Sequence, residues 1–204
     1  MERDKNQANQ VEITRILVEF LQVAITSIVF LKGVYPSGAF ERRRYMNVVV
    51  QRALHPQLRD YIESTVVGLK PFIHQGLVDR VAVLFFNKEN IPLERFIFKL
   101  QVNHSYGSNF QESDLEFSLR SFLTKLSVSE SLTKALPRDC KWEITAYFRT
   151  LPQASMNKEA ELWIPTDTKQ WQQPPTITPI KSIDSEPMCL QLYLEHPSLS
   201  ETTL

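Results

Sequence analysis

Side chains that commonly perform catalysis or bind metals are few in this chain, and they are scattered. Four histidines and two cysteines are the candidates: His55, His74, His104, His196, Cys140 and Cys189. Their separations do not match a zinc site, in which paired ligands lie about two to five residues apart. The 204 residues include only five glycines, and neither a phosphate-binding glycine loop nor a Gly-x-Ser-x-Gly nucleophile turn occurs. The sequence therefore predicts no enzyme, no metal and no cofactor.

The two cysteines and the N-terminus predict the compartment. Cys140 and Cys189 lie far apart and predict reduced thiols rather than a disulfide, as in cytosolic and nuclear proteins. The first ten residues, MERDKNQANQ, are polar and lack the apolar core of a secretion signal. We therefore expect a protein that is not secreted.

The charged residues balance, with 23 lysines and arginines against 23 aspartates and glutamates. Non-specific DNA affinity comes mainly from cations that neutralise phosphates. A chain of zero net charge is therefore not expected to bind nucleic acid directly. The one basic cluster, Glu41 to Arg44, has three interpretations: a solvated loop, a phosphate contact or a protein interface.

The segment ILVEFLQVAITSIVFLKGV, residues 16–34, has the length of a membrane span. Glu19 and Lys32 interrupt it, and charges inside a bilayer are costly. Apolar residues recur at three- and four-residue steps from Ile13 to Leu31, and other faces are apolar too. These features predict a largely buried helix and no membrane association.

The remaining segments predict an α+β fold. Two short strands flank Asn47, and a helix starts at Pro56. An apolar strand at 81–86 is joined by the turn NKEN to an alternating strand at 96–102, whose second face is predicted to be wetter. A helix opens at Ser113, where Glu116 completes a capping box, and a strand covers 142–148. Three helices packed on one face of an antiparallel sheet fit this order.

The C-terminal segment WQQPPTITPIKSIDSEPMCLQLYLEH, residues 171–196, begins as a proline-broken arm and ends as an alternating strand. One face of that strand carries Met188 and three leucines, which we expect to dock on the sheet. The opposite face presents Gln191 and Tyr193. This tyrosine is either an ordinary exposed edge residue or the anchor of a partner surface.

Several segments together resemble the HORMA-domain family, over about residues 10–196, and especially its mitotic-arrest-deficient-like branch of non-catalytic accessory subunits of DNA polymerase zeta. They are LVEFLQVAITSIVFLKGVYPSGAFERRRYMNVVVQ, HPQLRDYI, LKPFI, LRSFLTKLSV and LQLYLEH. The resemblance implies a HORMA fold at 10–196, whose residues 151–196 form a mobile safety belt. Residues 1–9 are then a disordered N-terminus and 197–204 a tail. Such a belt crosses over a partner peptide, and its terminal strand locks onto the sheet.

The resemblance also implies a site for the guest peptide. Tyr61, in LRDYI, matches a residue that packs on a proline-containing peptide of the catalytic subunit of DNA polymerase zeta. Trp171 matches the aromatic residue that closes the belt over that peptide. Trp163 is the competing candidate, with core packing as its alternative role.

Two further surfaces follow from the resemblance. Ile177, Gln191 and Tyr193 match a surface that binds the C-terminal domain of the Y-family deoxycytidyl-transferase scaffold. Arg42 and Arg120 match residues of a HORMA–HORMA interface, which implies a homodimer or heterodimer. Helical geometry agrees for Arg120, because it lies on an exposed flank beside the apolar stripe.

The implied function is that of a nuclear, and also cytoplasmic, adaptor in translesion synthesis, opened by an AAA+ remodeller. Two alternatives remain: a HORMA regulator of the spindle checkpoint or of the mitotic-exit ubiquitin ligase, and a direct DNA-binding protein. The sequence leaves open whether the belt is docked without a partner.

Overall fold

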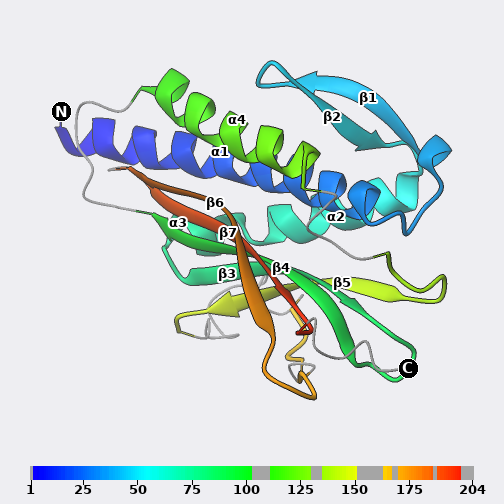
Figure 1. The fold of residues 1–204 in the computed structure, drawn as a ribbon. Helices are drawn as coiled ribbons and strands as arrows, with labels where there is room; N and C mark the ends of the chain where they lie inside the picture. Colours follow the sequence, from blue (N-terminus) through cyan, green and yellow to red (C-terminus); the bar gives the residue numbers. More distant parts are fainter. Residues whose placement is uncertain are drawn as a thin grey trace.

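Helix α1 (Glu2–Leu31) is the long helix of the layer that covers the sheet (Figure 1). Leu17, Phe20 and Ala24 are fully buried, and the helix packs against α2, α3, α4 and β2. By length and composition alone, Asn6–Leu31 could cross a membrane, yet 67% of its most apolar window is buried inside the protein. The prediction of a largely buried helix is therefore confirmed.

The start of α1 differs from the prediction. The helix begins at Glu2, whereas residues 1–9 are predicted to be disordered. Residues 2–9 contain glutamate, arginine, lysine, glutamine and alanine, which all favour helix. They extend a helix that is already nucleated by its buried half, so each added residue gains a hydrogen bond without a new nucleation cost.

One antiparallel sheet of five strands underlies the helices, with the order β5-β3-β4-β7-β6. The computed structural model describes residues 2–102, 111–129, 135–150, 163–166, 170–185 and 188–198. The strands are β3 (Val78–Phe86), β4 (Pro92–Val102), β5 (Lys141–Phe148), β6 (Thr176–Ser185) and β7 (Met188–His196). Every neighbouring pair is antiparallel, as predicted.

The other helices lie with α1 on the same side of the sheet (Figure 1). They are α2 (Pro56–Gly68), α3 (Lys70–His74) and α4 (Glu112–Ser127). Leu69 separates α2 from α3, and Pro71 falls in the first turn of α3, where its missing N–H costs no intrahelical bond. The α+β prediction, with three long helices on one face of an antiparallel sheet, is confirmed.

A two-stranded hairpin completes the helical side. After the single turn η1 (Ser37–Ala39), β1 (Phe40–Tyr45) pairs with β2 (Val48–Ala53). Met46 and Asn47 form the connection with φ angles of 47° and 59°. Positive φ at both central residues is what a tight two-residue hairpin turn requires. The strands predicted around Asn47 are thus confirmed.

The N-terminus of α4 corrects the capping-box prediction. The helix begins at Glu112 with Gln111 as its N-cap, and no side chain caps it. The backbone N–H groups of Asp114 and Leu115 donate to the Gln111 carbonyl instead. Ser113 therefore lies inside the first turn, too late in the chain to cap it. The predicted stripe of α4 is confirmed, since Leu115, Leu119, Phe122, Leu123 and Leu126 are all buried.

The prediction that one face of β4 is solvent-exposed is only half correct. Lys99 and Gln101 are exposed, whereas Arg95 is 8% and Ile97 is 1% exposed. Ile97 lies between Ala82 of β3 and Tyr193 of β7 in the register. Periodicity alone could not show this burial, because it depends on which strands flank β4.

The proline-broken arm ends as a strand. From Thr176 onward it forms β6, which pairs along its length with β7 and is the last strand of the sheet. The pairing shifts between Pro179 and Lys181. Proline lacks the N–H that a ladder needs, so it fits an edge strand at an irregularity.

Candidate peptide-binding edge and adjoining surfaces

A groove of about 490 Å³ lies between helix α2 and strand β5. Its lining comes from α2, β5 and the segment 163–166: Tyr61, Ser64, Thr65, Gly68, Glu143, Ile144, Trp163, Ile164 and Thr166. Within the described ranges, β5 is the terminal strand of the sheet on this side. The groove therefore presents the edge of a strand beside a helix.

Tyr61 connects the two walls of this groove. Its hydroxyl accepts the backbone N–H of Ile144 at 3.1 Å, and its ring packs edge-on against Trp142 with centroids 5.4 Å apart. Burial raises the pKa of this hydroxyl above its ordinary value. The residue remains 40% exposed, so part of the ring is available to a ligand.

The backbone of β5 can accept an additional strand. Since the Ile144 N–H reaches Tyr61, it points away from β3. Hydrogen-bonding direction alternates along an antiparallel strand, so the backbone groups of Trp142 and Ala146 face the same open edge. An extended peptide in the groove could pair with these groups, as in β-augmentation.

Trp163 also lines the groove. Its ring meets Phe148 of β5 edge-on at 6.4 Å, and a Cβ added at Gly68 would lie 3.6 Å from its indole nitrogen. The neighbouring Ile164 is 85% exposed. Of the two candidate tryptophans, Trp163 is the one that lies with Tyr61.

Trp171 lies elsewhere, against strands β4 and β7. Its ring covers the guanidinium of Arg95 at 5.6 Å, and its indole N–H donates to Glu195 at 3.4 Å. The structure thus does not bring Trp171 together with Tyr61. Only Trp163 lines the groove.

The terminal strand β7 is docked between β4 and β6. Met188, Leu190, Leu192 and Leu194 are each 0–1% exposed, and they pair in register with residues of β4. The predicted docking of this leucine face is confirmed. At about 1.5–3 kcal/mol for each buried side chain, the face holds β7 firmly on the sheet.

The predicted scaffold-binding residues lie on the opposite face of β6 and β7. Ile177 is 58% exposed and pairs with Glu195, and Gln191 is exposed two residues before Tyr193. Burial raises the pKa of Tyr193, and the Arg80 side chain hydrogen-bonds its hydroxyl. The structure therefore places all three predicted residues on one surface.

The predicted dimer residues lie on the helical side. Arg120 of α4 covers the ring of Phe117 at 4.7 Å, and Phe117 is 66% exposed. Arg42 is exposed on β1. The basic cluster is accordingly part of a strand rather than a loop.

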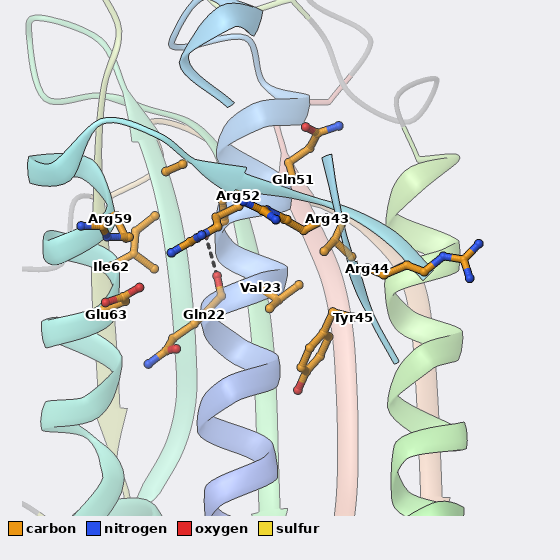
Figure 2. A pocket seen from close by; sticks show the side chains of 13 residues that line it. Gln22, Val23, Arg43, Arg44, Tyr45, Gln51, Arg52, Arg59, Ile62 and Glu63 are labelled. Atoms are coloured by element: carbon orange, nitrogen blue, oxygen red, sulfur yellow. Dashed lines mark hydrogen bonds between the residues drawn. The ribbon is translucent and has the colours of Figure 1, made fainter. Parts of the chain in front are cut away.

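Beside Arg42, a cleft of about 230 Å³ opens between the hairpin and helices α1 and α2 (Figure 2). Arg43, Arg44 and Arg52 of the hairpin and Arg59 of α2 line it. Glu41 holds Arg43 at 2.8 Å and Arg52 at 3.5 Å. The hairpin thus concentrates positive charge in a chain that is neutral as a whole.

The described residues do not support a metal site or a reactive cysteine. In the described part of the chain, no three His, Cys, Asp or Glu side chains gather as metal ligands. Cys140 and Cys189 are both free. Burial raises the pKa of the Cys140 thiol, and a hydrogen bond to Asp184 raises that of Cys189. Both thiols are therefore poor nucleophiles at neutral pH.

Sequence reasoning missed most of the groove lining. On α2, Ser64 and Thr65 lie three and four residues after Tyr61, and Gly68 lies four and three residues after them. This spacing places the four residues on one helix face, beside the apolar stripe. A row of small residues beside an exposed tyrosine was the available signal.

Comparison with known proteins adds independent findings. The HORMA domain pattern matches residues 14–160. The DNA polymerase zeta processivity subunit of Arabidopsis thaliana is 66% identical over 199 residues, which cover 98% of this chain and 92% of the relative. The mitotic spindle assembly checkpoint protein MAD2B of Homo sapiens is 32% identical over 190 residues, with 90% of each chain covered.

Solved structures agree on the fold. A chain of the mitotic checkpoint complex matches with a TM-score of 0.75 at 14% identity, covering 91% of this chain and 98% of that one. The C. elegans protein HTP-2 bound to the HIM-3 closure motif matches with a TM-score of 0.72 at 6% identity, covering 91% and 90%. These two likenesses show the architecture alone.

Proposed function

The chain belongs to the HORMA-domain family, and from this premise we propose that it is a non-catalytic adaptor subunit of the translesion DNA polymerase zeta. In this role it holds a proline-containing peptide of the catalytic subunit along the edge of β5. The safety belt, residues 151–196, crosses over that peptide. The proposal places the protein in the nucleus, and also in the cytoplasm, in DNA damage tolerance.

One observation carries the proposal. Strand β5 has an open edge inside a groove, and the chain beyond it returns to the far side of the sheet as the docked strands β6 and β7. A peptide paired with β5 would be enclosed by a segment that is held at both ends. Release then requires undocking of β7, so dissociation is expected to be slow.

Tyr61 and Trp163 are the aromatic residues that we assign to the guest peptide. Both line the groove, and flat aromatic rings pack well on proline. Trp171, the other candidate from the sequence, lies on Arg95 and receives a different role below.

The other surfaces extend the adaptor role. We assign Ile177, Gln191 and Tyr193 to the Y-family deoxycytidyl-transferase scaffold, because they share one accessible face of β6 and β7. We assign Arg42 and Arg120 to a HORMA–HORMA interface on the helical side. Opening of the belt is assigned to an AAA+ remodeller, since removal of a leucine-lined strand requires work.

Peptide capture tests the proposal. A fluorescently labelled, proline-containing peptide from the polymerase zeta catalytic subunit is mixed with the intact chain, and anisotropy is followed over time. Saturable binding with slow dissociation after addition of unlabelled peptide is expected. A chain that captures no such peptide would contradict the proposal.

The second candidate function is regulation of the spindle checkpoint or of the mitotic-exit ubiquitin ligase. It is favoured by the similarity to relatives named mitotic spindle assembly checkpoint protein. The same groove would serve, so the peptide discriminates between the functions. If a peptide from an activator of that ligase bound more tightly than the polymerase peptide, this second function would replace the first.

A further inference from the structure

Trp171, Arg95 and Glu195 form a cluster on the sheet face that is turned away from the helices. Arg95 and Trp171 both donate to the same carboxylate oxygen, Glu195 Oε2, at 3.2 and 3.4 Å. The Trp171 ring also covers the Arg95 guanidinium at 5.6 Å. Each of the three side chains therefore contacts the other two.

This cluster is largely withdrawn from water. The Arg95 and Glu195 side chains are 9% and 13% exposed. A charged pair in such surroundings is screened less than one at the surface, and an indole above the guanidinium adds a cation–π contact. Removal of Trp171 would re-expose the pair as well as delete its own contacts.

The cluster lies where three strands of the sheet come together. Arg95 and Glu195 are register partners on β4 and β7, and Glu195 also pairs with Ile177 near the start of β6. Trp171 precedes β6 by five residues, at the point where the chain joins the sheet. One side chain thus ties the entering segment to β7, with which β6 pairs, and to β4, the next strand of the sheet.

The two tryptophans lie against different parts of the sheet. Trp163 packs on Phe148 at the β5 side, and Trp171 packs on Arg95 at the β7 side. Trp163 lines the groove where a guest would contact it, whereas Trp171 does not.

We propose that Trp171 is a latch: a positioning residue that holds the belt closed through Arg95 and Glu195 without touching the guest. This inference rests on the proposed function. None of the three side chains lines the groove, so a guest there would leave their contacts in place, and the cluster stabilises the closed belt equally in the free and the occupied chain. It should therefore control the rates of exchange rather than the affinity.

A latch has a kinetic signature that a contact residue lacks. Entry and exit both require the open belt, so Trp171→Ala should speed association and dissociation together. We expect each rate to rise about thirty-fold or more, the size produced by losing one cation–π contact and one charge-assisted hydrogen bond. Their ratio, the Kd, should change less than about three-fold.

Stopped-flow anisotropy with the labelled catalytic-subunit peptide measures both rates on the intact chain. Trp163→Ala is the matched control, because it should speed dissociation and raise the Kd without speeding association. Trp171→Phe keeps an aromatic ring over the Arg95 guanidinium and loses the N–H donor to Glu195. Its association and dissociation rates should therefore fall between those of the wild type and those of Trp171→Ala. Trp171→Ala should add little in a Glu195→Gln background, since the variants disrupt one cluster.

Hydrogen exchange of the free chain provides a readout that needs no guest. Trp171→Ala should speed exchange at residues 188–196 while β3 and α1 stay protected. Uniformly faster exchange would indicate general destabilisation and overturn the latch, as would unchanged rates or an increase in dissociation alone. If the wild-type chain bound no peptide, the proposed function would be wrong. Hydrogen exchange at residues 188–196 of the free chain would still show whether Trp171 holds β7 on the sheet.

Discussion

At the scale of single residues, the Tyr61 hydroxyl links α2 to the open edge of β5, because it accepts the Ile144 N–H. The same side chain leaves part of its ring exposed to the groove. A few such aromatic residues usually supply most of the binding energy of an interface. Individual residues in this chain can therefore be tested separately for binding and for stability.

Removal of the Tyr61 ring should weaken guest binding. Tyr61→Ala is expected to raise the Kd for the catalytic-subunit peptide by about thirty-fold, or roughly 2 kcal/mol. Tyr61→Phe keeps the ring and should retain most of the affinity. Isothermal titration measures both, with Tyr147→Ala as the control, because Tyr147 is on β5 but packs against Arg80. Unaltered affinity of Tyr61→Ala would contradict the assignment.

The buried pair Lys32–Glu94 is a stability determinant that the function does not use. Its charged atoms lie 2.6 Å apart, and the two side chains are 1% and 3% exposed. Burial lowers the pKa of Lys32 despite its partner. Glu94→Ala removes the carboxylate that lies against a buried ammonium group and should lower the free energy of unfolding by about 3–5 kcal/mol.

Urea denaturation measures this loss. The exposed pair Lys88–Asp139 is the matched control, and Asp139→Ala should cause no measurable change. A double variant, Lys32→Met with Glu94→Leu, should recover most of the stability, since neither charge of this pair is then buried. Equal effects of the buried and exposed variants would show that burial does not set the cost.

At the scale of elements, β7 is the strand on which the rest of the belt depends. It pairs on one side with β4 and on the other with β6. Its leucine face belongs to the core, while its other face carries the predicted scaffold site. The strand therefore combines closure of the belt with presentation of a surface.

Shortening one core leucine of β7 should loosen the belt. Leu192 is 1% exposed, so Leu192→Ala should lower the free energy of unfolding by about 2–4 kcal/mol. Gln191→Ala, one residue away on the exposed face, should leave the stability unchanged. Thermal unfolding by circular dichroism compares them, and equal shifts in Tm would contradict the assigned burial.

At the scale of the whole molecule, the assigned surfaces lie on different sides. The groove lies at the β5 edge, the predicted scaffold site lies on the sheet face of β6 and β7, and Arg120 lies on the helical side. An adaptor with separate surfaces can bind several partners at once. Substitutions on one surface should therefore leave the other functions intact.

Self-association tests this separation. Arg120 covers the exposed ring of Phe117, and an arginine with an aromatic residue is a common interface anchor. Arg120→Ala should shift the chain towards monomer in light scattering, whereas Lys125→Ala on the same helix should not. Peptide capture should be retained. An undisturbed dimer, or a loss of capture, would contradict the assignment.

The local structure and the family can be inferred from the order of amino acids alone. Apolar residues recur every three or four positions in α1 and α4 and every two positions in β7. These spacings indicate which faces are buried, because burial of apolar side chains is the main driving force for folding. The first turn of α4 was not predictable in this way, since Ser113 and Glu116 have the spacing of a capping box without the geometry.

Contacts between residues that are distant in the sequence depend on the tertiary fold. The sequence pattern does not distinguish Trp163 from Trp171, yet Trp163 lines the groove and Trp171 covers Arg95. Their positions differ because they depend on where the chain meets the sheet. The burial of Arg95 and Ile97 likewise follows from the strands that flank β4. A pattern along the chain records burial, whereas contacts between segments depend on the order of strands in space.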